Sequence, residues 1–298
     1  MGRPLMQVVM ALAAATLTAV CGAQPIDTPG AVAALGARHD ELRPQLIDNA
    51  FHRPLYLSSS ESGDHVEGDA YAELDQPFAA FAPAFKSAVR VCDVLFLHLN
   101  VRSCQALLAS AGDALVLTVG PKRDVAPGMV YRMVYSLRIE AEGPDYLRVS
   151  LRASSGPLAT RNYRVVIEAM ALDGERSFVH CRYAYGYGIL AKMAMKIYLA
   201  TAGRSKVGFS VVDRTADGHP VYVGGERGSL ERNAMRYYLA VIAYVGAPPG
   251  PPRQQMEQRL RAWFQLTERY AAQLHELDLD EYLDEKHRDL RRRSVEQP

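Results

Sequence analysis

Few residues in this sequence have the types and spacing that catalysis requires. His98 and Asn100 lie two positions apart between Cys92 and Cys104, and they form the best candidate pair for acid–base chemistry. A histidine and an asparagine this close equally suit a pair that braces a loop. The serine-hydrolase motif G-x-S-x-G is absent. We therefore favour a protein that is not an enzyme, and His98 with Asn100 is the catalytic alternative.

Signals for a metal or a cofactor are also weak. The eight histidines are scattered, no C-x-x-C occurs, and His275-Glu276 lacks the second histidine of H-E-x-x-H. Residues 186–191 fit the dinucleotide fingerprint G-x-G-x-x-A, but the strand before them belongs to an antiparallel series without a βαβ unit. The sequence thus predicts no metal site and no bound cofactor.

Tyrosine is the most frequent aromatic residue, with 16 tyrosines against 8 phenylalanines and 1 tryptophan. Five tyrosines fall on the apolar face of predicted strands, and the first four are candidate ligand-binding residues: Tyr135, Tyr163, Tyr183, Tyr185 and Tyr187. Rings that carry a hydroxyl form apolar walls with polar tips, which suit an amphipathic ligand. The alternative is a set of core tyrosines bonded to backbone carbonyls.

Two arginines, Arg232 and Arg236, lie one turn apart on an otherwise apolar predicted helix. Buried guanidinium groups need partners. A ligand carboxylate or phosphate is one such partner, and the carboxylates of Glu168, Glu226 and Glu231 are the internal alternative, which we favour. Both arginines join the four tyrosines as candidate ligand-binding residues.

The composition and the first residues indicate an exported protein. The 298 residues include 34 Lys and Arg against 33 Asp and Glu, a balance that argues against a nucleic-acid partner. Residues 1–23 are predicted to be a signal peptide, because Arg3 precedes an apolar run that ends at Val20 and is shorter than the ~20 residues of a membrane span. An uncleaved anchor and a lipidated Cys21 are the alternatives to export into the periplasm. Cys92 and Cys104 are predicted to form a disulfide there, with two buried thiols as the alternative.

The pattern along the chain predicts the elements. Residues 24–50 read as a linker with a helical turn within 30–46, 54–75 as a strand pair, and 77–90 as two short helices split at Pro83. Residues 131–187 alternate in four strands with short turns, which predicts an antiparallel meander with one apolar face. A helix over 189–203, a hairpin over 207–223 and a buried helix over 230–245, with Glu231 in its first turn, follow.

Residues 248–252 break the chain before a C-terminal region. An amphipathic helix is predicted from 253, and the last twenty residues are predicted to be a solvated, charged helical tail. The boundaries predicted from the sequence are therefore a signal peptide (1–23), a linker segment (24–50), a main domain (51–247) and a helical extension with its tail (253–298).

This order of elements resembles the helix-grip fold of the START-like (SRPBCC) superfamily over roughly residues 51–247. The segments 161–164, 183–188, 206–209 and 231–238 also resemble segments of uncharacterised exported proteobacterial proteins. The resemblance implies an α+β domain whose curved antiparallel sheet wraps a long helix and encloses an apolar cavity. Members of the superfamily carry lipids, sterols or polyketides, and some are enzymes. The inserted helix and hairpin at about 189–225 and the C-terminal helices depart from the pattern.

The sequence therefore predicts a periplasmic protein that binds an apolar or amphipathic, lipid-like small molecule without catalysis. Its alternative is an enzyme on the same scaffold that uses His98 or a cavity tyrosine. A third hypothesis is an envelope interaction module that presents the helices of 253–298 to a partner.

Overall fold

Alternating apolar and polar residues form most of one antiparallel sheet. The protein is described by a computed structural model that covers residues 27–110, 112–120, 130–189, 191–193 and 206–296. The predicted signal peptide and most of the predicted helix 189–203 lie outside the described residues. The strands of the large sheet are β1 (Leu55–Ser62), β2 (His65–Leu74), β3 (Val101–Leu107), β4 (Ala114–Val119), β5 (Tyr131–Glu142), β6 (Tyr146–Ser155), β7 (Arg161–Ala171) and β8 (Ser177–Gly186).

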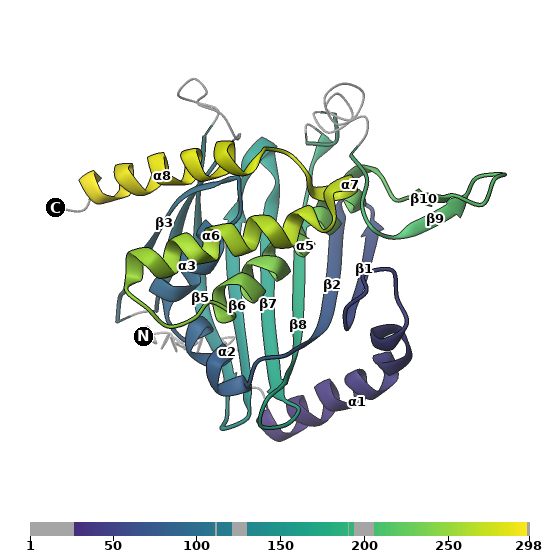
Figure 1. The fold of residues 1–298 in the computed structure, drawn as a ribbon, viewed down its shortest axis with the longest axis horizontal. Helices are drawn as coiled ribbons and strands as arrows, with labels where there is room; N and C mark the ends of the chain where they lie inside the picture. The colour runs from purple at the N-terminus through teal and green to yellow at the C-terminus, as the bar shows by residue number, and fades with distance from the viewer. Residues whose placement is uncertain (1–26, 111, 121–129, 190, 194–205, 297–298) are drawn as a thin grey trace, which may run out of the picture.

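The spatial order of the strands is β1-β2-β8-β7-β6-β5-β4-β3, and every neighbouring pair is antiparallel. From β2 the chain passes through α2 (Phe78–Phe85) and α3 (Ala88–Phe96) to β3 at the far edge, and it returns as a meander to β8, which pairs with β2. Helix α5 (Gly225–Val245) then lies across one face of the curved sheet (Figure 1). Apart from the extra edge strand β1, this is the helix-grip order, so the predicted α+β fold is confirmed.

Helix α5 forms the centre of the core. Its residues Leu230, Leu239 and Ala240 are fully buried against the sheet and the neighbouring helices. Gly68 in β2 permits this approach, because a Cβ at that position would overlap the Leu230 side chain. The helix begins at Gly225 rather than at the predicted residue 230, so its first turn holds Glu226 and not Glu231.

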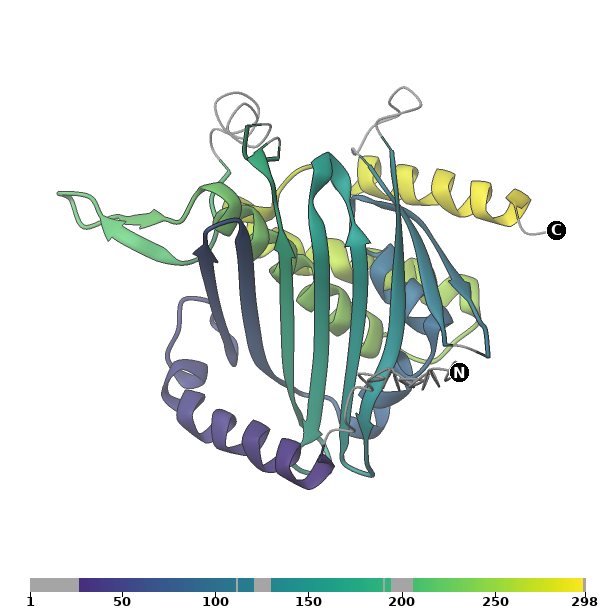
Figure 2. The ribbon, with the colours of Figure 1, turned by 180° about the vertical axis from the view of Figure 1, so that it is seen from behind.

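The segment predicted as a linker is a 20-residue helix, α1 (Thr28–Ile47). Leu35, Leu42 and Leu46 are buried in a second core that also includes Tyr146 and Phe178 of the sheet. Figure 2 shows α1 beside the lower end of the sheet, on the face opposite α5. The linker prediction was wrong because only three leucines mark the buried side of α1, too few for a clear helical period.

The predicted split at Pro83 was also wrong. Pro83 lies inside α2, and the break falls at Lys86 and Ser87, after which α3 begins. Proline removes one hydrogen bond from the helix. Burial of Phe81 and Phe85, which stack on each other, offsets that loss.

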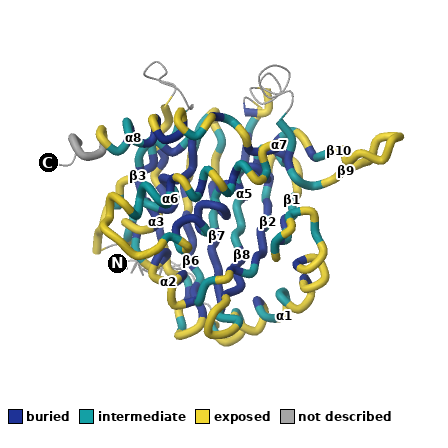
Figure 3. The backbone as a smooth tube through the Cα atoms, viewed as in Figure 1, coloured by how far each residue is buried: buried dark blue, intermediate teal, exposed yellow. Residues whose placement is uncertain are grey.

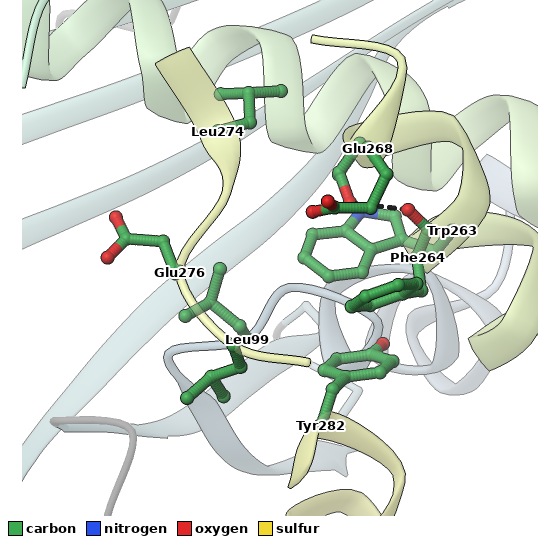
Figure 4. A pocket seen from close by; sticks show the side chains of 9 residues that line it. Leu99, Trp263, Phe264, Glu268, Leu274, Glu276 and Tyr282 are labelled. Atoms are coloured by element: carbon green, nitrogen blue, oxygen red, sulfur yellow. Dashed lines mark hydrogen bonds between the residues drawn. The ribbon is translucent and has the colours of Figure 1, made fainter. Parts of the chain in front are cut away.

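The C-terminal region consists of α6 (Pro252–Glu268), α7 (Ala271–Leu274) and α8 (Leu279–Glu296). The amphipathic helix is confirmed, but the last segment is not a solvated tail, because Tyr282, Leu283 and Lys286 are buried (Figure 3). Trp263 stacks on Tyr282 at 5.1 Å, and the two rings lie close to Leu99 around a cavity of about 10 Å³ (Figure 4). That space holds about one water molecule.

These contacts bear on the interaction-module hypothesis. Leu260, Trp263 and Leu274 are buried in the core of their own chain, and Phe264 packs against it. The core of the chain itself already covers this apolar stripe, so these residues give the interaction-module hypothesis no support.

The predicted disulfide between Cys92 and Cys104 is confirmed, with a Cα–Cα distance of 5.2 Å. No helix among the described residues has the length and apolar character needed to cross a membrane.

The outer face of the sheet holds a buried cluster of charge. His180 donates or accepts at both ring nitrogens, with Asp69 at 2.7 Å and Glu168 at 3.3 Å, and its ring stacks on Tyr71 at 4.1 Å. Burial opposes a charge on His180, but the hydrogen bonds to the two carboxylates outweigh it and raise the pKa of His180. Burial also opposes the charge on Asp69 and Glu168, and hydrogen bonds from His180 and other donors lower the pKa of both.

We expect the stability of the protein to depend on pH through His180. Because its folded-state pKa lies above the unfolded value of about 6.5, its contribution is complete below about pH 6.5 and is lost as the pH rises through the folded-state pKa. The carboxylates act oppositely, and their contribution is lost as the pH falls below about 4. His180→Gln should flatten the dependence on the alkaline side in urea unfolding between about pH 6 and pH 9. Equal slopes for both proteins would contradict this assignment.

Candidate functional site

Five tyrosine rings meet between the sheet and α5. Tyr135 comes from β5, Tyr163 from β7, Tyr183 and Tyr185 from β8, and Tyr237 from α5. Tyr163 stacks on Tyr185 at 5.3 Å and lies 6.3 Å from Tyr135, and Tyr183 lies 6.2 Å from Tyr237. We call these five residues the tyrosine cluster. Period-two alternation places the four strand tyrosines on the inner face, as the sequence predicts.

The hydroxyls of the cluster fall into two groups. The Tyr163 hydroxyl lies 2.7 Å from the Thr160 hydroxyl, and the Tyr185 hydroxyl donates to Glu226 at 3.0 Å. Among the residues that the structure describes, no hydrogen-bond partner is recorded for the hydroxyls of Tyr135, Tyr183 and Tyr237. The alternative of tyrosines bonded to backbone carbonyls therefore does not describe these three.

The surroundings of the cluster keep its hydroxyls protonated. Burial, followed by the neighbouring tyrosines, raises the pKa of Tyr135 and Tyr183 well above the usual range. Burial likewise raises the pKa of Tyr237. The Tyr183 and Tyr237 side chains nevertheless keep part of their accessible surface. Neutral phenols can donate and accept hydrogen bonds, so the cluster offers both functions to a bound molecule.

One acidic residue, Glu226, is hydrogen-bonded to the tyrosine cluster. It lies in the first turn of α5, is buried, and accepts the Tyr185 hydroxyl. Burial raises its pKa, and the hydrogen bond from Tyr185 partly offsets that effect. Just after the end of β8, the Tyr187 hydroxyl donates to Glu61. This end of the sheet thus carries two tyrosine–carboxylate pairs.

The two predicted arginines do not join the tyrosines. Arg236 donates through Nη2 to Glu276 at 2.9 Å and to the Leu274 carbonyl at 3.2 Å, on the side of α5 that meets α7. Arg232 is buried one turn earlier on the same side. The carboxylate partner of Arg236 is Glu276, and not one of the three carboxylates that the sequence suggested.

His98 and Asn100 form a bracing contact. The backbone N–H of Asn100 donates to Nδ1 of His98 at 3.1 Å, so the neutral ring carries its proton on Nε2. The ring is 2% exposed and stacks on Tyr237 at 4.7 Å. The geometry favours the loop-bracing interpretation, because the Asn100 contact uses the backbone and not the side chain.

Three residues of this region were not predicted as site residues. Glu226 was considered only as a partner of the arginines and Tyr237 was not considered, because only the phase of α5 against the sheet shows which side of the helix faces β8. Glu231 accepts from the backbone N–H groups of Phe209 and Ser210 at 2.6 and 2.9 Å and from the Ser210 and Ser59 hydroxyls. It therefore fixes the segment before the hairpin of β9 (Val211–Arg214) and β10 (Pro220–Tyr222) against β1. The hairpin itself is confirmed.

No protein-family model and no curated protein matches the sequence. Solved structures do. A START superfamily protein from Mycobacterium smegmatis is 11% identical with a TM-score of 0.31, over 50% of this chain and 95% of that chain. Ginseng major latex-like protein 151 from Panax ginseng is 14% identical with a TM-score of 0.31, over 48% and 95%. A conserved protein of unknown function from Enterococcus faecalis is 6% identical with a TM-score of 0.33, over 70% and 91%.

Because these TM-scores are low, the fold is assigned from the strand order of the chain itself. That order, with two short helices after β2 and a long helix after β8, is START-like. The likeness to exported proteobacterial proteins stays a prediction.

Among the described residues, no three His, Cys, Asp or Glu side chains are grouped as a metal site.

Proposed function

We propose that the protein binds an amphipathic, lipid-like small molecule between the sheet and α5, in contact with the tyrosine cluster. The observation that carries the proposal is the set of three hydroxyls, on Tyr135, Tyr183 and Tyr237, with no recorded partner among the described residues. These hydroxyls are not among the fully buried atoms that lack a partner, so they stay open to a bound molecule. Each neutral hydrogen bond that a ligand makes to one of them is worth about 1 kcal/mol.

The accessible surface of the cluster supports the same proposal. Tyr183 and Tyr237 are deep enough for burial to raise the pKa of each hydroxyl, yet both rings keep accessible surface. Close-packed interiors leave few spaces larger than a water molecule. We infer that the rings border open space under α5, with the apolar ring faces as its walls and the hydroxyls as its polar points.

The proposal predicts that two of the hydroxyls contribute to affinity. The neutral fluorescent amine 1-aminoanthracene is the probe, because its amino group can bond to a phenol. We expect the double variant Tyr183→Phe, Tyr237→Phe to bind it about 30-fold more weakly, since each of the two neutral hydrogen bonds is worth roughly 1 kcal/mol. Fluorescence titration measures the dissociation constants.

Tyr56→Phe is the matched control. Tyr56 lies on β1 and packs on the outer-face core beside Tyr71, away from the cluster. We expect its affinity for the probe to equal that of the unchanged protein. An unchanged affinity in the double variant as well would show that the cluster does not contact the probe.

One observation favours a second candidate, an enzyme on the same scaffold. The Tyr185 hydroxyl and the buried carboxyl of Glu226 are within hydrogen-bond reach, and burial raises the pKa of both groups. Such a pair can supply a proton to a bound molecule. The binding proposal and the catalytic one differ in whether the molecule leaves chemically unchanged.

The proposed location is an oxidising compartment such as the periplasm. The disulfide between Cys92 and Cys104 supports it, because such bonds persist mainly in exported proteins. The proposal also includes the predicted signal peptide at 1–23, which lies outside the described residues. The main domain at 51–247 and the extension at 253–298 stay proposed boundaries, now with α1 ahead of them.

A further inference from the structure

A second cavity lies at the edge of the sheet, away from the tyrosine cluster. Its volume is about 580 Å³, within the range of small-molecule sites. It is formed where the loop before β1, the base of the β9–β10 hairpin and the junction of α6 with α7 come together at the side of the molecule from which the hairpin projects (Figure 1). Two of these walls, the base of the hairpin and the α6–α7 junction, belong to segments that depart from the START-like order of elements.

Three aromatic rings form one side of this cavity. Phe51 lies 5.6 Å from Phe209 and 6.2 Å from Tyr270, and Phe209 lies 5.8 Å from Tyr270. These are the distances at which aromatic rings attract one another, and a flat apolar group can add to such a set. Tyr222 from β10 adds a fourth ring to the lining.

The charged side chains that line this cavity are positive. Among the described residues that line it, Arg53, Arg269 and His52 are basic and none is acidic. Arg53 is half-buried and lines the cavity, while its Nη1 atom is fully buried and so is not the part of the guanidinium open to a ligand. Carboxylates and phosphates are the acceptors that match the geometry of a guanidinium group.

The walls are held in place by hydrogen bonds. The Tyr270 hydroxyl donates to the Phe51 carbonyl at 3.1 Å, which joins the α6–α7 junction to the loop before β1. Glu231 fixes the backbone of Phe209 and Ser210 from the other side. A site whose walls are fixed in advance loses less entropy on binding.

From these observations we infer a second ligand site that binds a small molecule with a planar apolar body and one oxyanion, a carboxylate or a phosphate. The oxyanion bonds to the accessible part of the Arg53 guanidinium with Arg269 nearby, and the planar body lies against Phe51, Phe209 and Tyr270. The inference goes beyond the proposed function, because none of these residues belongs to the tyrosine cluster.

Isothermal titration calorimetry of the purified protein with 2-naphthoate tests this site. We expect saturable binding that Arg53→Met weakens by about 10- to 100-fold, the range that a charge-assisted hydrogen bond provides. The neutral alcohol 2-naphthylmethanol should bind the unchanged protein about as weakly as 2-naphthoate binds the Arg53→Met variant. A titration with 2-naphthyl phosphate identifies the preferred oxyanion by its tighter binding.

A second variant covers the case in which Arg53→Met does not fold. Ala272 is exposed at the wall of the cavity, so Ala272→Trp should fill the space and abolish binding without disturbing the core. Arg43→Met, at an exposed arginine of α1, and Tyr183→Phe, in the tyrosine cluster, should both bind 2-naphthoate like the unchanged protein. Loss of binding in Tyr183→Phe would move the probe to the other site and overturn the inference. So would the absence of binding, or unchanged binding in Arg53→Met and Ala272→Trp.

Discussion

Replacing Lys286 with methionine should lower the free energy of unfolding by about 3 kcal/mol. Lys286 is 1% exposed, and its Nζ donates to the carbonyls of Phe96, His98 and Val101 at 2.7, 2.8 and 2.8 Å. These carbonyls lie where α3 ends and the turn to β3 follows, so the ammonium also meets the negative end of the helix dipole. Methionine has a similar length and no donor, and the three carbonyls would lose the group that satisfies them.

The size of the effect should depend on the charge state of Lys286. Burial lowers its pKa to about 7, and only the ammonium can donate to three carbonyls at once, so the full loss is expected below about pH 7. Urea unfolding measures the loss. Lys86→Met is the matched control, because Lys86 pairs with Glu142 at the surface and such pairs contribute about 1 kcal/mol or less. A loss below about 1 kcal/mol in Lys286→Met would contradict the account of α8 as an integral element.

Replacing Glu231 with leucine should release the segment that leads into the β9–β10 hairpin. Glu231 is fully buried and accepts four hydrogen bonds, from Ser59, Phe209 and both the backbone and side chain of Ser210. Leucine leaves these donors without an acceptor at a cost of about 3 kcal/mol. Hydrogen exchange of the Phe209 and Ser210 amides should therefore become roughly 100-fold faster.

The conservative change Glu231→Gln separates the hydrogen bonds from the side-chain shape. The amide oxygen can still accept both backbone N–H groups, so exchange should accelerate much less than in the leucine variant. Glu41→Leu, on the exposed side of α1 where Glu41 pairs with Arg38, is the control and should leave these amides unchanged. Unchanged exchange in Glu231→Leu would mean that other contacts hold the segment. Since Phe209 lines the second cavity, the leucine variant should also weaken 2-naphthoate binding.

The sequence predicts the sheet well because its signal is local. Period-two alternation between 131 and 187 places Tyr135, Tyr163, Tyr183 and Tyr185 on one face, and pairing of antiparallel strands then brings the rings together. The disulfide is similarly predictable, because the two cysteines are 12 positions apart and the predicted export would place them in an oxidising compartment.

The phase of a helix against its sheet is not a local property, so the sequence did not indicate that Glu276 would be the internal carboxylate that pairs with Arg236. A spacing of four places Arg232 and Arg236 on one side of α5, but it does not indicate whether that side meets the sheet or α7. The role of Glu231 depends on donors from β1 and from residues 209–210, which only the tertiary structure brings together. Lys286 binds backbone carbonyls, and these have no signature in the sequence, so a charged tail reads as solvated.

The central claim is that a small molecule binds against the tyrosine cluster, and native mass spectrometry of the purified protein tests it most directly. We predict a complex heavier than the polypeptide by one small amphipathic molecule, which solvent extraction releases and which the Tyr183→Phe, Tyr237→Phe variant retains at lower occupancy. Release of the molecule chemically unchanged after incubation would favour binding over catalysis. A protein mass equal to the polypeptide alone, together with no uptake of added 1-aminoanthracene, would contradict the claim.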